Sequence, residues 1–226
     1  MQEKACGEWR RRMIAAEILR VTDRKRKIVL EDESSFVLYA GELRKYHIRE
    51  GEEIPEEVLE EIHDDVLVKR AKLRCMNLLK TSDRTVHQLR DRLRHDGYPE
   101  EIAEKALAYV ASYHYTDDER YAENYIRQQS GRKSRKVIVL ELEKKGVDSD
   151  VIREAYSAVG QENQANAPFL QGSADVGAIR KLIRKRGYDA AHASWDEQQK
   201  LTGYLMRKGF EAADIRSVLR EFQGQD

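Results

Sequence analysis

A pattern of 22 residues occurs three times in this chain, and it limits the folds that the chain can adopt. The copies align on a glycine without gaps, over residues 89–110, 138–159 and 201–222. In each copy aliphatic residues stand four and eight positions before the glycine, and an apolar stripe follows at positions +6, +9 and +10. Repeats of this length indicate one supersecondary unit that stacks on copies of itself.

Each unit is expected to contain three helices. Aliphatic pairs four residues apart, such as Leu201 and Leu205, share one face of a helix. Gly97, Gly146 and Gly209 are expected to end that helix, because glycine adopts the left-handed C′ conformation at least cost. The stripe after each glycine predicts another helix. An amphipathic segment before each pair predicts a first helix, at about 66–79, 116–126 and 176–187, which gives nine helices in residues 66–226.

Two of these helices carry sequence signals for their starting points. Thr116 and Glu119 have the spacing of a capping box, and so do Ser194 and Glu197. The stretch 160–177 is rich in Gly, Asn, Gln and Ala and lacks periodicity, so we expect a longer, mobile connection there.

The residues ahead of the repeats have a different pattern. Segments 17–21, 27–31 and 35–40 alternate and are rich in β-branched residues, which predicts a small antiparallel hairpin or three-stranded sheet. An acidic helix is expected to start near Pro55, and the sheet is expected to pack on it or on the first unit. The predicted fold is mainly α, with three tandem three-helix units in an elongated, curved arrangement. The expected domains are 1–64, 65–115, 116–160 and 161–226.

Composition excludes several classes of protein. Hydrophobic residues make up 40% of the chain and charged residues 36%, and the net charge is zero, which argues against a generally basic nucleic-acid-binding coat. No apolar run has the length of a signal peptide or a membrane span. Cys6 and Cys75 are too few for a disulfide scaffold. We therefore expect a reduced, cytoplasmic setting.

Catalytic and metal-binding patterns are absent from the sequence. It contains no GxxxxGK[ST] phosphate loop, no HExxH and no CxxC, and its six histidines lack ligand-like spacing. The acids from Asp117 to Glu119 favour a helix N-terminus over a Mg²⁺ site. Cys75 lies on an apolar helical stripe, where a buried thiol is the usual outcome. The sequence therefore predicts a protein that is not an enzyme and has no cofactor or metal.

Two clusters of cations are the candidate binding residues. The first lies in the link before a helix and the second on one helix. Their members are Arg132, Lys133, Arg135, Lys136, Arg180, Lys181, Arg184, Lys185 and Arg186. Tyr188 and Trp195 stand nearby and could stack on exposed bases. The alternative is a solvated charged face with both aromatic residues in the local core. Weaker candidates are Arg10 to Arg12 and Arg24 to Lys27.

The chain resembles the RecX family, the small regulators of the recombinase RecA. Residues 113–129, YHYTDDERYAENYIRQQ, are similar to the motif that opens the family's middle unit. The matching residues are Tyr115, Asp117, Asp118, Tyr121 and Ala122. Residues 140–155 resemble the family segment that follows this motif. Residues 81–93 resemble the pattern of the family's first unit, with Arg84, Leu89 and Leu93 in register. Residues 41–62 are similar to the stretch ahead of the repeats in members from low-GC Gram-positive bacteria, so the resemblance covers most of the chain.

The resemblance implies a function and a partner. RecX-like proteins bind the filament of RecA on single-stranded DNA, block its extension or promote its disassembly, and so reduce ATP hydrolysis and strand exchange. It implies a monomer that contacts RecA, while direct contact with the DNA stays open. Many members carry a Lys-Gly-Pro turn where this chain has GRKSRKVI (131–138), a denser basic cluster.

Two other classes of protein remain possible from the residues alone. One is a sequence-nonspecific nucleic-acid-binding protein of helix-turn-helix-like units without a recombinase partner. The other is a helical-repeat scaffold for another protein.

Overall fold

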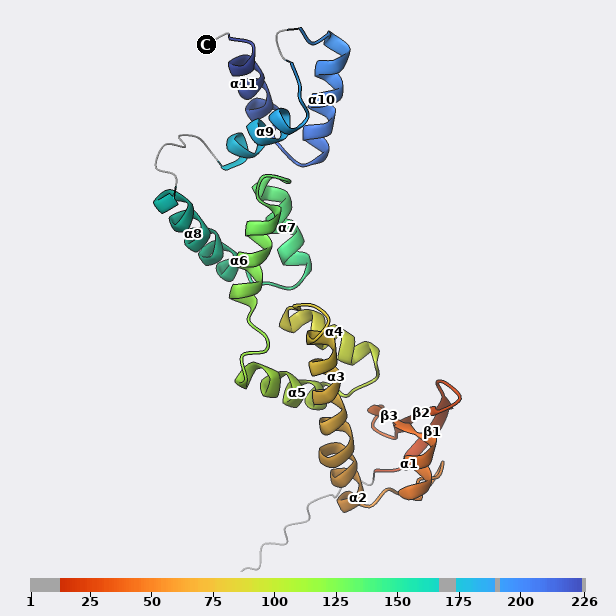
Figure 1. Ribbon diagram of the computed structural model, residues 1–226. Coiled ribbons are helices and arrows are strands. Elements are labelled where there is room, and N and C mark those ends of the chain that lie inside the picture. Colours follow the sequence, from red (N-terminus) through yellow and green to blue (C-terminus); the bar gives the residue numbers. More distant parts are fainter. Residues whose placement is uncertain (1–12, 167–173, 190–191, 225–226) are drawn as a thin grey trace, which may run out of the picture. The chain divides into compact units, whose positions relative to one another are not determined.

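The computed structural model describes residues 13–166, 174–189 and 192–224 (Figure 1). Cys6 and the weaker candidates Arg10 to Arg12 lie outside these ranges. The chain divides into two compact units, unit 1 with residues 1–116 and unit 2 with residues 117–226. Across the described ranges, no helix is both long and apolar enough to cross a membrane.

A three-stranded antiparallel sheet opens unit 1, as the alternation predicts. The strands β1 (Ala15–Arg20), β2 (Lys25–Leu30) and β3 (Ser35–Tyr39) lie in the order β1-β2-β3. Ile28 pairs with Phe36 across β2 and β3, and both side chains are buried. Because side chains alternate along a strand, these residues share one face of the sheet with Leu38, and this face forms part of the core.

The acidic helix and the first helix of the first repeat form one continuous helical run. After the short α1 (Ala40–Lys45) the run comprises α2 (Glu56–Glu61), a π-helical stretch (Ile62–Val68) and α3 (Lys69–Leu79). The sequence pattern predicts two separate helices here, and the expected boundary between residues 64 and 65 falls inside the run. Ile62 and Leu67 are both buried although they stand five positions apart. The wider π-helical turn accommodates that spacing on one face.

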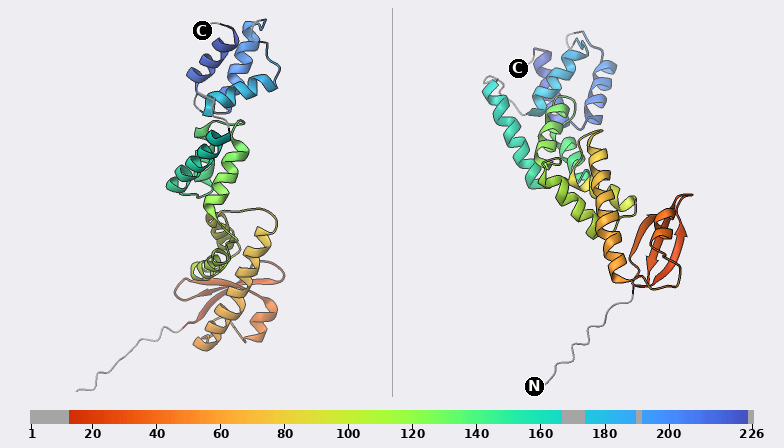
Figure 2. Two further views of the ribbon diagram at one scale, coloured as in Figure 1. Left: turned by 60° about the vertical axis from the view of Figure 1, so that its left-hand side comes forward. Right: turned by 60° about the horizontal axis from the view of Figure 1, so that its bottom comes forward.

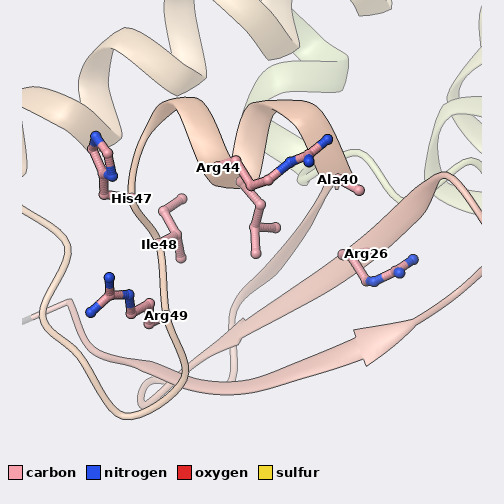
Figure 3. A pocket seen from close by; sticks show the side chains of 7 residues that line it. Arg26, Ala40, Arg44, His47, Ile48 and Arg49 are labelled. Atoms are coloured by element: carbon pink, nitrogen blue, oxygen red, sulfur yellow. The ribbon is translucent and has the colours of Figure 1, made fainter.

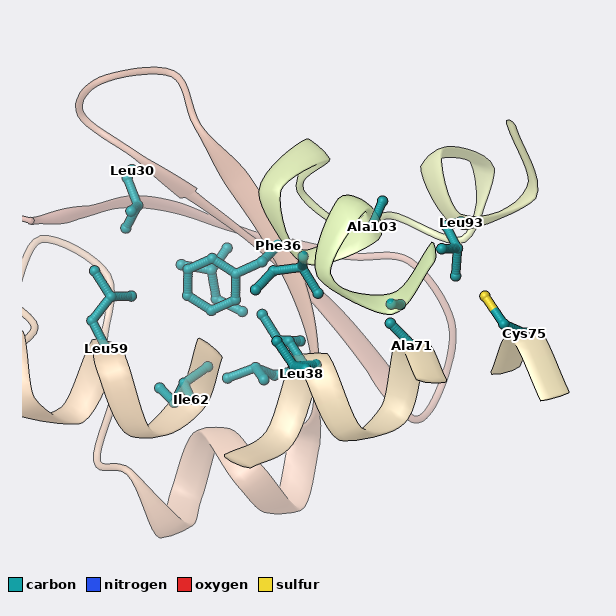
Figure 4. Packing of buried hydrophobic residues seen from close by; sticks show 14 of the residues in the cluster. Leu30, Phe36, Leu38, Leu59, Ile62, Ala71, Cys75, Leu93 and Ala103 are labelled. Atoms are coloured by element: carbon teal, nitrogen blue, oxygen red, sulfur yellow. The ribbon is translucent and has the colours of Figure 1, made fainter. Parts of the chain in front are cut away.

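Unit 1 has a single apolar core, which joins the sheet to the first repeat (Figure 4). The repeat is completed by α4 (Val86–His95) and α5 (Glu100–Ser112). Phe36 and Leu38 from the sheet lie beside Ile62 and Ala71 of the helical run. Cys75 is fully buried, as predicted, and burial raises the pKa of its thiol to about 11. A sheet of three short strands therefore obtains its stability from the helices that it covers.

Unit 2 contains the second and third repeats (Figure 2). Each of these repeats has its own apolar core. The second repeat comprises α6 (Asp118–Gln129), α7 (Arg135–Lys144) and α8 (Ser149–Asn166). The third comprises α9 (Ala174–Lys185), α10 (Trp195–Arg207) and α11 (Ala212–Phe222). Thus residues 69–222, where described, contain the predicted nine helices, and the aliphatic pairs of the repeat are buried in them.

The glycines of the repeat end α4, α7 and α10 as predicted. Gly97, Gly146 and Gly209 have φ of +87°, +77° and +87°, the left-handed conformation that a side chain disfavours. The connection between the second and third repeats is shorter than expected. Helix α8 continues to Asn166 and α9 begins at Ala174, so much of the stretch 160–177 is helical.

One of the two predicted capping boxes is wrong. Ser194 and Glu197 form the box at the start of α10. At α6, however, Asp117 is the N-cap and its carboxylate accepts the N–H of Arg120 at 2.8 Å. Thr116 is buried instead, one position before the cap. Two possible caps stand side by side in the sequence, and the carboxylate has the additional advantage of its charge at the positive end of the helix dipole.

Candidate nucleic-acid interface

The first cation cluster lies in a tight loop between α6 and α7. Gly131 has φ of +80°, and the N–H groups of Arg132 and Lys133 both donate to the carbonyl oxygen of Gln129, at 2.9 and 3.2 Å. Ser134 is buried and caps α7 by accepting the N–H of Val137 at 3.4 Å. Arg135 and Lys136 therefore stand in the first turn of the helix, where their side chains are exposed.

The second cluster lies beside this loop, within unit 2. A Cβ atom on Gly131 would be 3.5 Å from Cδ of Lys181, so the loop passes the side of α9. The N–H of Arg135 donates to Oδ1 of Asp175 in the first turn of α9, at 2.9 Å. Two clusters that are far apart in sequence thus meet on one surface, which no local sequence pattern predicts.

The four cations of the first cluster have different partners. Nζ of Lys133 is 2.6 Å from Oε1 of Glu141, and the hydroxyl of Tyr125 donates to Oε2 of the same carboxylate at 2.7 Å. The hydrogen bond from Lys133 lowers the pKa of Glu141. The guanidinium of Arg135 lies 4.4 Å from the ring centroid of Tyr156. Lys133 therefore has a structural role, while Arg132 and Lys136 are exposed and form no ion pair with any described residue.

The second cluster likewise contains one cation in an ion pair and several exposed cations without one. Arg180 forms two hydrogen bonds of 2.9 Å with the carboxylate of Glu221 on α11. The guanidinium of Arg184 lies 5.9 Å from the ring of Phe222, and that of Arg186 lies 3.8 Å from the ring of Tyr204. The other four members of this cluster, Lys181, Arg184, Lys185 and Arg186, are exposed and form no ion pair with a described residue.

The two candidate stacking residues have different environments. Tyr188 packs against the core of the third repeat, as the alternative of a solvated charged face predicts. Trp195 is 72% exposed at the first position of α10, so the expectation of a core position is wrong for this residue. A ring at the N-terminus of a helix has few neighbours to cover it, and Trp195 is available to a ligand.

An acidic spot borders the cationic surface at the start of α9. Burial raises the pKa of Asp175, and the nearby charges of Asp214 and Glu211 raise it further, while the N–H of Arg135 lowers it. The cationic surface of unit 2 therefore consists of the loop between α6 and α7 together with α9. The acidic residues Asp175, Glu211 and Asp214 lie at its edge. Exposed cations of this kind bind phosphate oxygens. Within the described ranges, no three His, Cys, Asp or Glu side chains are grouped as metal ligands.

A second group of basic residues lines a pocket in unit 1 (Figure 3). The pocket has a volume of about 370 Å³ between the sheet and α1, and its basic lining residues are Arg26, Arg44 and Arg49, together with His47. The guanidinium of Arg26 donates to the carbonyl oxygens of Thr22 and Lys25, and Arg49 pairs with Glu52 at 3.5 Å. Arg26 belongs to the weaker candidates Arg24 to Lys27. The other three were missed, because only the fold of α1 against the sheet places them together.

Comparison with known proteins identifies the three repeats individually. Residues 71–109 match the family model of the first three-helix domain of RecX, residues 117–155 match the second, and residues 174–219 match the third.

Comparison with individual proteins also finds members of the RecX family. The chain is 26% identical to the regulatory protein RecX of Clostridium acetobutylicum over 86% of this chain and 88% of that protein. It is 28% identical to the regulatory protein RecX of Caldanaerobacter subterraneus over 92% of this chain and 98% of that one. A crystal structure of a regulatory protein RecX is 22% identical to this chain and has a TM-score of 0.50. The match covers 95% of this chain and 100% of that one, and it supports the fold.

Proposed function

The chain belongs to the RecX family, and we propose that it regulates RecA by binding filaments of RecA on single-stranded DNA. In this proposal the bound protein blocks filament extension or promotes disassembly, and so inhibits ATP hydrolysis and strand exchange by RecA. The cationic surface of unit 2 contacts the phosphates of the filament. The protein acts as a monomer in the cytoplasm and catalyses no reaction of its own.

The observation that supports phosphate contact is the meeting of the two cation clusters. Lys181 lies against Gly131, next to Arg132, so exposed cations from a loop and a helix share one surface. The net charge of the chain is zero, so the attraction for nucleic acid is local. Several weak contacts from linked repeats add through their effective concentration, which suits a long filament better than a single short site.

A titration of the RecA ATPase tests the proposal. RecA is assembled on single-stranded DNA with ATP and Mg²⁺, and the full chain is added from well below equimolar amounts upward. We expect the rate of ATP hydrolysis to fall at substoichiometric protein, because one bound molecule at a filament end affects many RecA protomers. An unchanged rate at a molar excess of the protein would refute the proposal.

The same titration separates regulation from simple competition for DNA. A nonspecific single-strand-binding protein would inhibit only when it covers the DNA, so its effect would depend on the ratio of protein to nucleotides. We expect inhibition of preformed filaments to depend on the ratio of protein to RecA. Fluorescence anisotropy of labelled DNA, with and without RecA, should show tighter binding when RecA is present.

A further inference from the structure

Three tyrosines, one half-buried and two exposed, form a cluster at the end of α5 in unit 1. Tyr109 lies in the last turns of the helix, Tyr113 caps it, and Tyr115 follows in the next turn. The ring centroids of Tyr109 and Tyr113 are 5.0 Å apart. Those of Tyr113 and Tyr115 are 5.7 Å apart with an interplanar angle of 16°, so these two rings are stacked. Tyr113 and Tyr115 are 56% and 50% exposed.

The backbone turn at His114, and not burial in the core, brings the ring of Tyr115 against the ring of Tyr113. His114 has φ of +53°, and its N–H donates to the carbonyl oxygen of Ala111 at 2.9 Å. The N–H of Tyr115 donates to the carbonyl oxygen of Val110 at 3.0 Å, which completes a Schellman ending. A residue with a Cβ is strained in this left-handed conformation. The stacked pair thus depends on a chain reversal that costs stability, and core packing does not account for it.

A lysine from another helix adds positive charge to the cluster. Nζ of Lys72 on α3 lies 4.5 Å from the ring centroid of Tyr109. Lys72 forms no ion pair with a residue in the described part of the chain. The cluster therefore combines exposed aromatic rings with a cation that has no carboxylate to neutralise it. Aromatic rings next to cations are the combination that binds single-stranded nucleic acid, since the rings stack on bases and the cations attract phosphates.

We propose that Tyr113 and Tyr115, with Lys72 on the adjoining ring of Tyr109, form a stacking site for unpaired nucleobases. The ligand is a single-stranded nucleic acid, whose base lies on the exposed tyrosine rings and whose phosphate approaches Lys72. This inference rests on the proposed function in one respect, because that function brings single-stranded DNA to the protein. The site is distinct from the cationic surface of unit 2, since it recognises the flat faces of bases and not the charge of the backbone alone.

The experiment measures binding of the full chain to two labelled oligonucleotides of equal length and charge, without RecA. One is oligo-dT, and the other is an abasic strand with the same backbone. We expect the protein to bind oligo-dT more tightly than the abasic strand. The variant Tyr113→Ala/Tyr115→Ala should bind oligo-dT about 5- to 100-fold more weakly, the range for loss of base stacking, with unchanged affinity for the abasic strand.

Two further variants keep the test decisive. Tyr113→Phe/Tyr115→Phe retains both rings and should bind both strands like the unaltered chain, which separates stacking from a requirement for the hydroxyl groups. Lys72→Gln should weaken binding to both strands alike. If the alanine variant loses its fold, as shown by circular dichroism, Tyr113→Trp replaces it. Its added fluorescence should then be quenched by oligo-dT and not by the abasic strand.

The outcomes distinguish this site from the proposed function. Equal affinity of the unaltered chain for both strands, or unchanged oligo-dT binding by the alanine variant, would overturn the stacking site whatever the ATPase assay shows. If the alanine variant binds oligo-dT normally but no longer inhibits RecA, the tyrosines contact protein and this inference is wrong. If it loses oligo-dT while the unaltered chain fails to inhibit RecA, the stacking site stands and the proposed function falls.

Discussion

Gly209 lies so close to Val137 that a Cβ atom on the glycine would overlap the valine Cγ2. The turn after α10 in the third repeat thereby packs on the start of α7 in the second, and the N–H of Ser134 donates to the carbonyl oxygen of Lys208 at 3.1 Å. Gly97, the equivalent glycine of the first repeat, also lies against a valine side chain of the preceding module. A Cβ on Gly97 would be 2.6 Å from Cγ2 of Val37 in β3. In the first and third repeats the glycine therefore ends a helix and also contacts the preceding module.

We expect Gly209→Ala to destabilise the protein by about 2–4 kcal/mol. The change adds the strain of a left-handed alanine and an overlap with Val137. Gly187→Ala is the matched control, because Gly187 has φ of +63° but a Cβ added to it would have no neighbouring atom within 4 Å. It should cost only about 1–2 kcal/mol. Urea unfolding measures both, and equal costs would show that the contact with Val137 does not matter.

Truncation of the contact partner should partly rescue the Gly209 variant. Val137→Ala in the Gly209→Ala background removes the overlapping methyl group, although Ser134 Oγ would remain 2.7 Å from the added Cβ. We expect a favourable coupling of about 0.5–3 kcal/mol between the two changes, the range for residues in contact. Additive effects would contradict the contact.

Leu142→Ala should reduce the free energy of unfolding by about 2–5 kcal/mol, because it empties a fully buried position in the core of the second repeat. Leu140 on the same helix is the control, since it is 47% exposed and its truncation should stay within about 0.5 kcal/mol of zero. Because repeats couple mainly to their neighbours, hydrogen exchange should increase most in α6, α7 and α8.

Acid should weaken the second repeat through Glu141. Its pKa is lowered from an ordinary value of 4.5, chiefly by the hydrogen bond from Lys133. A carboxylate with a lowered pKa in the folded state contributes stability above its unfolded value, and this contribution is lost as the pH falls through the folded pKa. We expect Glu141→Gln to cost about 0.5–1 kcal/mol at pH 7.

The pH dependence of that variant provides the specific test. The difference in unfolding free energy between the unaltered chain and Glu141→Gln should shrink as the pH falls below about 4.5. Glu143→Gln on the same helix is the control, because Glu143 is exposed and pairs with no described residue. A difference that stays constant from pH 7 to pH 3 would mean that the ion pair with Lys133 does not contribute to stability.

The helices and their ends are accessible from the sequence because they depend on local patterns. The leucine pairs, Gly97, Gly146 and Gly209 each act through residues within a few positions. The partners of the cations are not accessible in this way. Lys133 in the loop before α7 pairs with Glu141 on α7, and Arg180 on α9 pairs with Glu221 on α11. The first pair depends on how the loop folds back on the helix, and the second depends on how two helices pack. The approach of Lys181 to Gly131 depends on the packing of one repeat on another.

The exposure of each cation determines which changes test phosphate binding cleanly. Reversal of Lys133 or Arg180 would place a glutamate against Glu141 or Glu221 and would disturb the fold. Arg132→Glu/Lys136→Glu avoids this, since solvated charges contribute little to stability. Lys200→Glu/Arg216→Glu is a control with the same change in net charge, at exposed positions of α10 and α11.

We expect Arg132→Glu/Lys136→Glu to weaken inhibition of RecA and to flatten the dependence of binding on salt. Each phosphate contact on a single strand adds about −0.7 to the slope of log K against log salt, because bound counterions are released. The control pair should leave both the slope and the inhibition close to those of the unaltered chain, since attraction by net charge alone is shared by the two variants. If both pairs inhibit RecA at the same concentration and with the same salt dependence as the unaltered chain, phosphate contact at this surface is refuted. The acidic face of α2, with its glutamates at 56–57 and 60–61, would then be the next surface to alter.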